Sequence, residues 1–134
     1  MRIPGRKPRG QHPPPASFAP GLSVHTEAFE LGATVVVAGE LDLATIPRLR
    51  AELESSELAA VDAVVVDLSG VTFMDSSGLA LLLDFERALR ERQGRLAIAC
   101  PEGPARLLFD VTGVGETLGL YGSRDAAQVA LSAR

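Results

Sequence analysis

The stretch of residues 64–83 constrains the fold more than any other part of the chain. It starts with three consecutive valines, and consecutive β-branched residues are typical of a strand that is covered by helices on both faces. After a short loop, Ser76 and Ser77 open an apolar segment that is typical of a helix, and Asp75 or Ser76 can cap its first free N–H groups. The stretch therefore predicts a central strand, a loop and a helix, with the two serines at the carboxyl edge of the strand.

The remainder of the chain alternates between strand-like and helix-like segments. Residues 22–28 alternate apolar and polar side chains, and residues 33–38 form an apolar strand that can pair with them as a hairpin. The patterns predict helices and further strands at 44–58 (helix), 62–68 (strand), 76 to about 92 (helix), 95–100 (strand), about 104–112 (helix), 117–121 (strand) and 123–132 (helix). This order predicts a single α/β domain, in which an N-terminal hairpin leads into a mostly parallel mixed sheet of about five strands with about four helices.

The first 20 residues differ in composition from the rest of the chain. They contain six prolines and four basic side chains without an acidic one, which predicts a disordered basic tail at 1–20 before a domain at 21–134. The tail is either an electrostatic tether to an acidic partner or a plain solvated extension, and its sequence leaves both open. The other residues carry a net charge of −8, which argues against direct binding of nucleic acid.

Cysteine content and the length of the apolar runs predict the compartment. The single cysteine, Cys100, excludes an internal disulfide and suits a reducing cytoplasm. The longest wholly apolar runs, such as residues 79–83, are far shorter than the ~20 residues that a membrane-spanning helix needs. We therefore expect a cytoplasmic protein without a membrane span.

Most catalytic and metal sites are excluded by residues that the sequence lacks. Ser76 at a strand-to-helix turn resembles the nucleophile of hydrolases, but the Gly-x-Ser-x-Gly pattern is missing. The two histidines, His12 and His25, lie in the tail and on the polar side of the first strand, so neither is placed to act as a catalytic base. With one cysteine and one lysine in the chain as well, we predict that the protein is not an enzyme and holds no metal.

Residue chemistry alone leaves two interpretations of the Ser76 turn. Asp75, Ser76 and Ser77 could simply cap a helix. Alternatively, Ser76 could accept a phosphate, which would add roughly −1.5 to −2 charges beside Asp75, and beside Asp42 if the loop after the second strand lies at the same sheet edge. The first interpretation predicts no regulation, and the second predicts a switch of surface charge.

The five apolar residues 79–83 raise a related question. A helix on one face of a sheet needs only a stripe of apolar side chains, yet this run covers every side of the helix for more than a turn. Either some of Leu79, Leu81 and Leu83 are exposed as a protein interface, or the last helix covers them.

Three segments of the sequence resemble the STAS domain family, and specifically the bacterial anti-sigma factor antagonists. The segment 71–79, Val-Thr-Phe-Met-Asp-Ser-Ser-Gly-Leu, is similar to the phosphorylation loop of that family almost residue for residue. The segment 39–42, Gly-Glu-Leu-Asp, and the segment 106–113, Arg-Leu-Leu-Phe-Asp-Val-Thr-Gly, resemble two further family signatures. The resemblance covers residues 22–132 and leaves the tail outside it.

The resemblance implies a binding protein that sequesters an anti-sigma factor serine kinase and so releases a sigma factor for transcription. Phosphorylation of Ser76 by that kinase would switch the antagonist off, and a metal-dependent serine phosphatase would restore it. It further implies no cofactor for this chain, a monomer or weak dimer, and partner-binding positions at Asp42, Asp75, Ser77, Gly78 and Leu79.

Two points about the resemblance stay open. The family commonly has a polar residue where Leu43 follows Asp42, and the proline-rich and arginine-rich start is unusually long, so the identity of the partner is not determined. The alternative function is that of a non-catalytic STAS subunit in a stress-sensing assembly or a membrane transporter complex.

Overall fold

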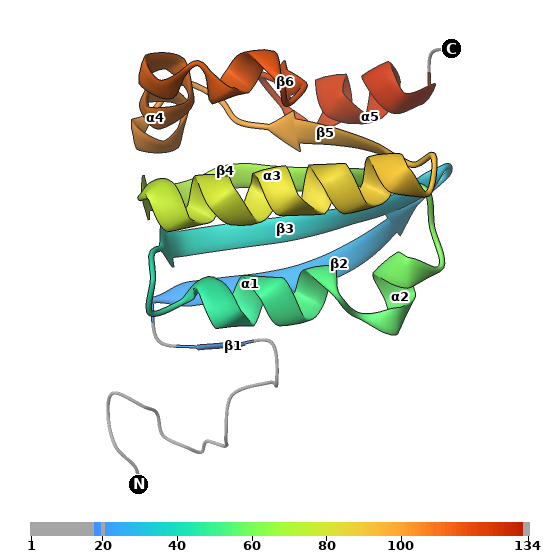
Figure 1. Ribbon diagram of the computed structural model, residues 1–134, viewed down its shortest axis with the longest axis horizontal. Coiled ribbons are helices and arrows are strands. Elements are labelled where there is room, and N and C mark those ends of the chain that lie inside the picture. Colours follow the sequence, from blue (N-terminus) through green and yellow to red (C-terminus); the bar gives the residue numbers. More distant parts are fainter. Residues whose placement is uncertain (1–17, 20, 133–134) are drawn as a thin grey trace, which may run out of the picture.

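A computed structural model describes residues 18–19 and 21–132 (Figure 1). The elements follow one another as β1 (Phe18–Ala19), β2 (Leu22–Phe29), β3 (Gly32–Leu41), α1 (Ile46–Leu53), α2 (Ser56–Ala59), β4 (Ala63–Met74), α3 (Ser76–Glu91), β5 (Arg95–Ala99), α4 (Pro104–Thr112), the 3-10 turn η1 (Val114–Glu116), β6 (Leu120–Tyr121) and α5 (Arg124–Ser132). No helix of this described part is long and apolar enough to cross a membrane.

The strands form one sheet in the order β1-β2-β3-β4-β5-β6. The pairs β1–β2 and β2–β3 are antiparallel, whereas β3, β4, β5 and β6 are parallel to one another. The predicted α/β architecture, with a hairpin that leads into a mostly parallel sheet, is confirmed. The tail predicted at 1–20 lies outside the described residues except for β1, so its disorder remains a prediction.

Helices cover both faces of the central strand β4. Val64 and Val66 point into the main core beneath α1, α3 and α4, whereas Val65 points into a second, smaller core beneath α5. Successive residues of a strand point to opposite faces, so a strand covered on both sides needs consecutive apolar residues. In Figure 1, α1 and α3 run side by side over the first of these faces.

Three predicted boundaries were wrong. The last strand, expected at 117–121, is only β6 (Leu120–Tyr121). The helix expected at 44–58 is divided into α1 and α2, because the Ser55 hydroxyl accepts a hydrogen bond from the Leu58 amide and starts a new helix. The loop expected after residue 68 is instead strand: β4 continues to Met74 and pairs there with the end of β3. Only Asp75 separates this strand from α3.

Both interpretations of the leucine run were also wrong for its first members. Leu79 and Leu81 are only 5% and 3% exposed, and Leu83 is half-buried against the same main core. The last helix, α5, does not cover them, because it packs on the opposite face of the sheet. The sheet and the helices beside α3 bury them instead.

Candidate functional site

The loops after β3 and β4 lie at one edge of the sheet. The two strands are parallel and in register at their ends, where Leu41 is opposite Met74. The backbone N–H of Asp75 donates to the carbonyl of Leu41 at 3.2 Å, which ties the two chain segments together. We call this region, made of the turn 42–45 with Asp75 and the first turn of α3 (76–78), the Ser76 edge. The loop that carries Asp42 therefore lies at the same edge of the sheet as Ser76.

Asp75 caps helix α3. Its Oδ1 accepts hydrogen bonds from the Ser77 amide at 2.9 Å and from the Ser77 hydroxyl. The hydrogen bond from the Ser77 side chain is the main cause that holds the pKa of Asp75 below its ordinary value, and backbone N–H groups of Ser77, Gly78 and Leu43 lower it further. Asp75 is therefore a carboxylate at neutral pH and contributes one negative charge to the edge.

Ser76 occupies the first position of α3 and is exposed. Within the described residues, its hydroxyl has no hydrogen-bond partner, in contrast to the Ser77 hydroxyl, which Asp75 holds. The two serines of the predicted site thus differ: the Ser77 hydroxyl is held by Asp75, whereas that of Ser76 is bonded to none of the residues that the structure describes.

Gly78 and Leu79 lie beneath this surface. Both are buried, and a Cβ atom on Gly78 would come within 2.9 Å of Met74 Cγ and 3.2 Å of Leu41 Cδ2. Glycine at this position lets the start of α3 rest directly on the ends of β3 and β4. The structure thus brings both predicted partner-binding residues to the site, where they support the loop from behind.

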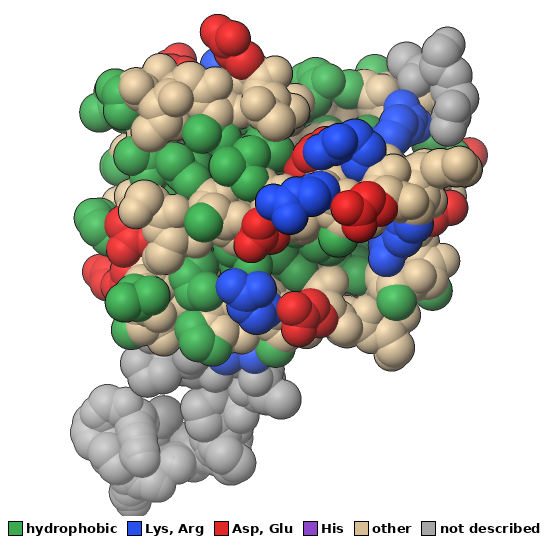
Figure 2. Space-filling model, viewed as in Figure 1, with side chains coloured by type: hydrophobic (Ala, Val, Ile, Leu, Met, Phe, Trp, Pro, Cys, Tyr) green, Lys and Arg blue, Asp and Glu red, His purple; other side chains and the backbone are tan. Residues whose placement is uncertain are grey.

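Asp42 organises the turn between β3 and α1. Its Oδ1 accepts hydrogen bonds from the amides of Ala44 and Thr45 at 3.0 and 3.1 Å. The Thr45 hydroxyl in turn donates to the Glu40 carbonyl at 2.8 Å. Figure 2 shows acidic side chains at the left, over the starts of α1 and α3, without a basic side chain beside them in this view. The Ser76 edge therefore carries an acidic side chain on each of its two loops, Asp42 after β3 and Asp75 after β4.

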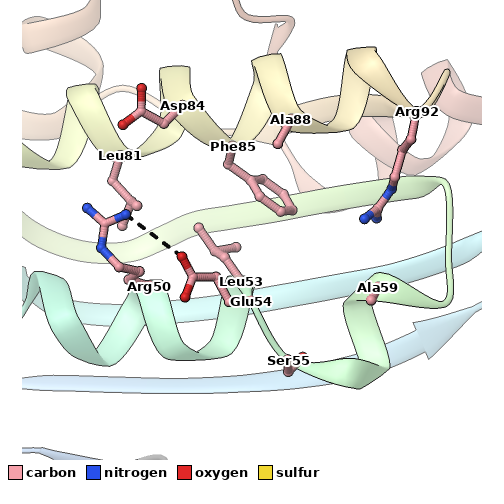
Figure 3. A pocket seen from close by; sticks show the side chains of 10 residues that line it. All are labelled: Arg50, Leu53, Glu54, Ser55, Ala59, Leu81, Asp84, Phe85, Ala88 and Arg92. Atoms are coloured by element: carbon pink, nitrogen blue, oxygen red, sulfur yellow. Dashed lines mark ion pairs between the residues drawn. The ribbon is translucent and has the colours of Figure 1, made fainter.

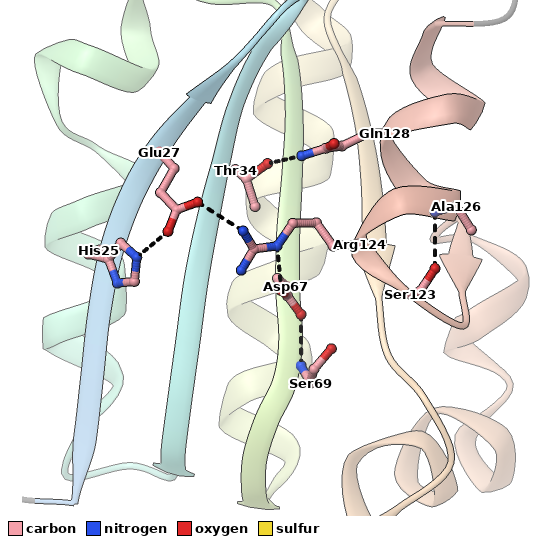
Figure 4. Close-up of polar contacts among 9 residues, drawn as sticks. All are labelled: His25, Glu27, Thr34, Asp67, Ser69, Ser123, Arg124, Ala126 and Gln128. Atoms are coloured by element: carbon pink, nitrogen blue, oxygen red, sulfur yellow. Dashed lines mark hydrogen bonds and ion pairs between the residues drawn. The ribbon is translucent and has the colours of Figure 1, made fainter.

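A second polar cluster was missed by sequence reasoning (Figure 4). Arg124 of α5 donates from Nε to Asp67 Oδ2 at 2.9 Å and from a terminal nitrogen to Glu27 Oε1 at 2.8 Å. Glu27 also contacts His25 Nε2 at 2.7 Å. Burial by itself would raise the pKa of Asp67, but hydrogen bonds from Ser69 and Arg124 outweigh it, and the pKa lies below its ordinary value. An aspartate after four buried apolar residues of a central strand was the signal that could have revealed this cluster.

An open groove of about 320 Å³ lies between α1 and α3, away from Ser76 (Figure 3). Its wall includes Leu53, Leu81 and Phe85, and an ion pair between Arg50 and Glu54 at 4.0 Å closes one side. Among the residues that the structure describes, no three His, Cys, Asp or Glu side chains gather as a possible metal site.

The described residues thus form a small α/β domain with a mixed sheet, in which an acidic cap and a serine follow the end of the central strand. A model of the STAS domain matches residues 24–127. The chain belongs to the STAS domain family.

Its similarity extends to several relatives. An anti-sigma-B factor antagonist of Staphylococcus epidermidis is 32% identical over 97 residues, which are 72% of this chain and 90% of that protein. An anti-sigma factor antagonist from Mycobacterium paratuberculosis, solved as a crystal structure, is 29% identical with a TM-score of 0.78 and covers 85% of this chain and 97% of its own.

The anti-sigma factor antagonist SpoIIAA is similar in two solved forms. Its unphosphorylated form is 26% identical with a TM-score of 0.65, covering 84% of this chain and 99% of its own. The phosphorylated form, described as a Bacillus cell fate determinant, is 27% identical with a TM-score of 0.60, covering 81% and 99%. A relative of this chain is therefore a phosphoprotein.

Proposed function

We propose that this protein is an anti-sigma factor antagonist that binds an anti-sigma factor serine kinase, and that phosphorylation of Ser76 switches this binding off. The observation that carries the proposal is the exposed Ser76 hydroxyl, unpartnered within the described residues, at the acidic start of α3. The names of the relatives and the phosphorylated form of one of them support it. In this role the protein acts as a cytoplasmic binding partner rather than as an enzyme.

The local hydrogen bonds favour a phosphate group that points away from the helix into solvent. A phosphate at the start of a helix is normally held by the free amides there. Here the Ser77 amide already donates to the Asp75 carboxylate, and the Gly78 amide to the Asp75 carbonyl. The added charge of roughly −1.5 to −2 would therefore project from the surface next to an ionised Asp75. It would repel an acidic partner surface, or leave a desolvated charge in the interface, without a change of fold.

The cycle requires two other proteins. In the forward step, the Ser76 oxygen attacks the γ-phosphorus of ATP bound to the kinase, ADP leaves, and a base of the kinase takes the hydroxyl proton. In the reverse step, a metal-dependent serine phosphatase directs water at the phosphoserine, which releases inorganic phosphate and restores the hydroxyl. The nucleotide and the metal belong to these partners.

Phosphate transfer from the cognate kinase tests the proposal. The full chain is incubated with this kinase and ATP, and the modified residue is located by mass spectrometry. We expect one phosphate, on Ser76, in the wild type and in Ser77→Ala, and none in Ser76→Ala. Phosphate on Ser77, or an unmodified chain, would contradict the proposal. In a binding assay, Ser76→Asp should weaken the complex while Ser76→Ala retains it.

A further inference from the structure

Leu43 is the most exposed of the large apolar side chains in the described part of the chain, at 77%. A single exposed leucine is common on protein surfaces and by itself indicates nothing. Leu43 differs by its place: it follows Asp42 in the Ser76 edge, and its backbone N–H is one of the groups that lower the pKa of Asp75. The backbone of Leu43 therefore lies close to the carboxylate that caps α3, and its apolar side chain is exposed at the same edge of the sheet.

The backbone that carries Leu43 is fixed on both sides. The Asp42 carboxylate holds the amides of Ala44 and Thr45, and the Thr45 hydroxyl is bonded to the end of β3. The core positions on either side of the turn are already filled by the buried Leu41 and Ile46. The side chain is thus presented to solvent by a preorganised turn, which reduces the entropy lost when a partner covers it.

We infer that Leu43 is an apolar anchor of the Ser76 edge, which inserts into an apolar pocket of the anti-sigma factor kinase and contributes to the choice of that kinase. The inference rests on the proposed function of the edge. If the pocket of a kinase is lined by polar groups, Leu43 would displace the water bound to these groups without offering them a hydrogen bond. The leucine therefore discriminates against such a kinase.

The anchor and the phosphate act through different physical terms. Burial of Leu43 is a hydrophobic contribution that salt hardly screens, whereas the charge at Ser76 acts by electrostatics that salt weakens. The two contributions can therefore be separated in one set of titrations.

The test measures the affinity of the full chain for the kinase recovered with Ser76→Ala as bait, by titration calorimetry at low and high salt. Leu43→Asn should bind roughly ten-fold more weakly at both salt concentrations, the order expected when most of a leucine side chain is left without its apolar contact. Leu43→Met should bind like the wild type. Leu31→Asn is the matched control, because Leu31 is 46% exposed in the β2–β3 turn at the opposite end of the strands, and its affinity should not change.

Each outcome separates the anchor from the switch. Equal affinity of Leu43→Asn and wild type, while Ser76→Asp still weakens binding at low salt, would overturn the anchor and leave the proposed function standing. An equal loss in Leu31→Asn would also overturn it. A kinase that depends on Leu43 but leaves Ser76 unmodified would support the anchor and contradict the switch.

Discussion

Two aspartates of the same strand region, Asp67 and Asp75, use their negative charge in different ways. Both have a pKa below the ordinary value. Asp67 is 5% exposed, and Arg124 neutralises it. Asp75 is held by the Ser77 hydroxyl and by backbone N–H groups, and within the described residues it forms no ion pair.

The two charges differ in how the fold compensates them. At Asp67 the charge is neutralised inside the fold and joins α5 to β4. At Asp75 it is oriented by neutral donors, and no basic side chain of the described residues pairs with it. A charge that the fold does not neutralise is available to a partner, and a second charge placed next to it changes the surface strongly.

Removal of Arg124 should have the largest effect on stability. Arg124→Ala leaves the buried Asp67 carboxylate without its cation, and we expect this to lower the free energy of unfolding by about 3 kcal/mol. This value is at the low end for a broken buried ion pair, because the arginine side chain is 34% exposed and water replaces part of the contact. Urea unfolding followed by circular dichroism measures it. Arg50→Ala, which breaks only the exposed pair with Glu54, is the control and should unfold like the wild type. Equal stability of Arg124→Ala and wild type would show that the pair does not hold α5.

Crowding behind Asp75 should have the next largest effect. Gly78→Ala places a methyl group 2.9 Å from Met74 Cγ, so either the Met74 side chain or the start of α3 must shift, and we expect a shift of the helix at a cost of about 2 kcal/mol. Phosphorylation of Ser76 should slow in the same variant, because the cap moves with the helix. Gly122→Ala is the control, since no atom lies within 4 Å of its new methyl group. An unchanged thermal midpoint in Gly78→Ala would mean that Met74 moves aside freely.

Loss of the cap itself should cost less. Asp75→Ala removes the acceptor of the Ser77 amide, and we expect about 1 kcal/mol of destabilisation, as for other helix caps. Its effect on kinase binding should exceed its effect on stability, because the exposed charge is lost as well. If unfolding and binding were both unchanged, Asp75 would have neither role.

The smallest effect concerns pH. A carboxyl group whose pKa is lower in the folded protein stabilises the fold fully above its unfolded pKa of about 3.9, and this stabilisation is lost as the pH falls through the folded value. The difference in unfolding free energy between wild type and Asp67→Asn should therefore be present at pH 7 and narrow below about pH 4. A difference that stays constant down to pH 2 would contradict the ionised pair.

Prediction from the sequence succeeded where the signal was local. The valine run at 64–66 predicted a strand covered on both faces, and Ser123 predicted the start of α5, where its hydroxyl accepts from the Ala126 amide at 3.1 Å. It failed where a distant partner decided the outcome. Residues 69–74 contain Ser69 and Gly70 and were expected as a loop, but the end of β3 pairs with them and extends the strand.

The sequence by itself determined the alternation of strands and helices, the family, and the serine pair at the end of the central strand. These features follow from the periodicity of apolar residues, from capping residues and from short motifs, all of which depend on residues close together in the chain. Only the tertiary structure decided that Asp75 holds the Ser77 hydroxyl while no described residue binds that of Ser76, that Leu79 and Leu81 are buried, and that Leu43 is exposed at the same edge. The physical reason is that burial and charge compensation depend on contacts between residues far apart in the chain, and no local pattern records them.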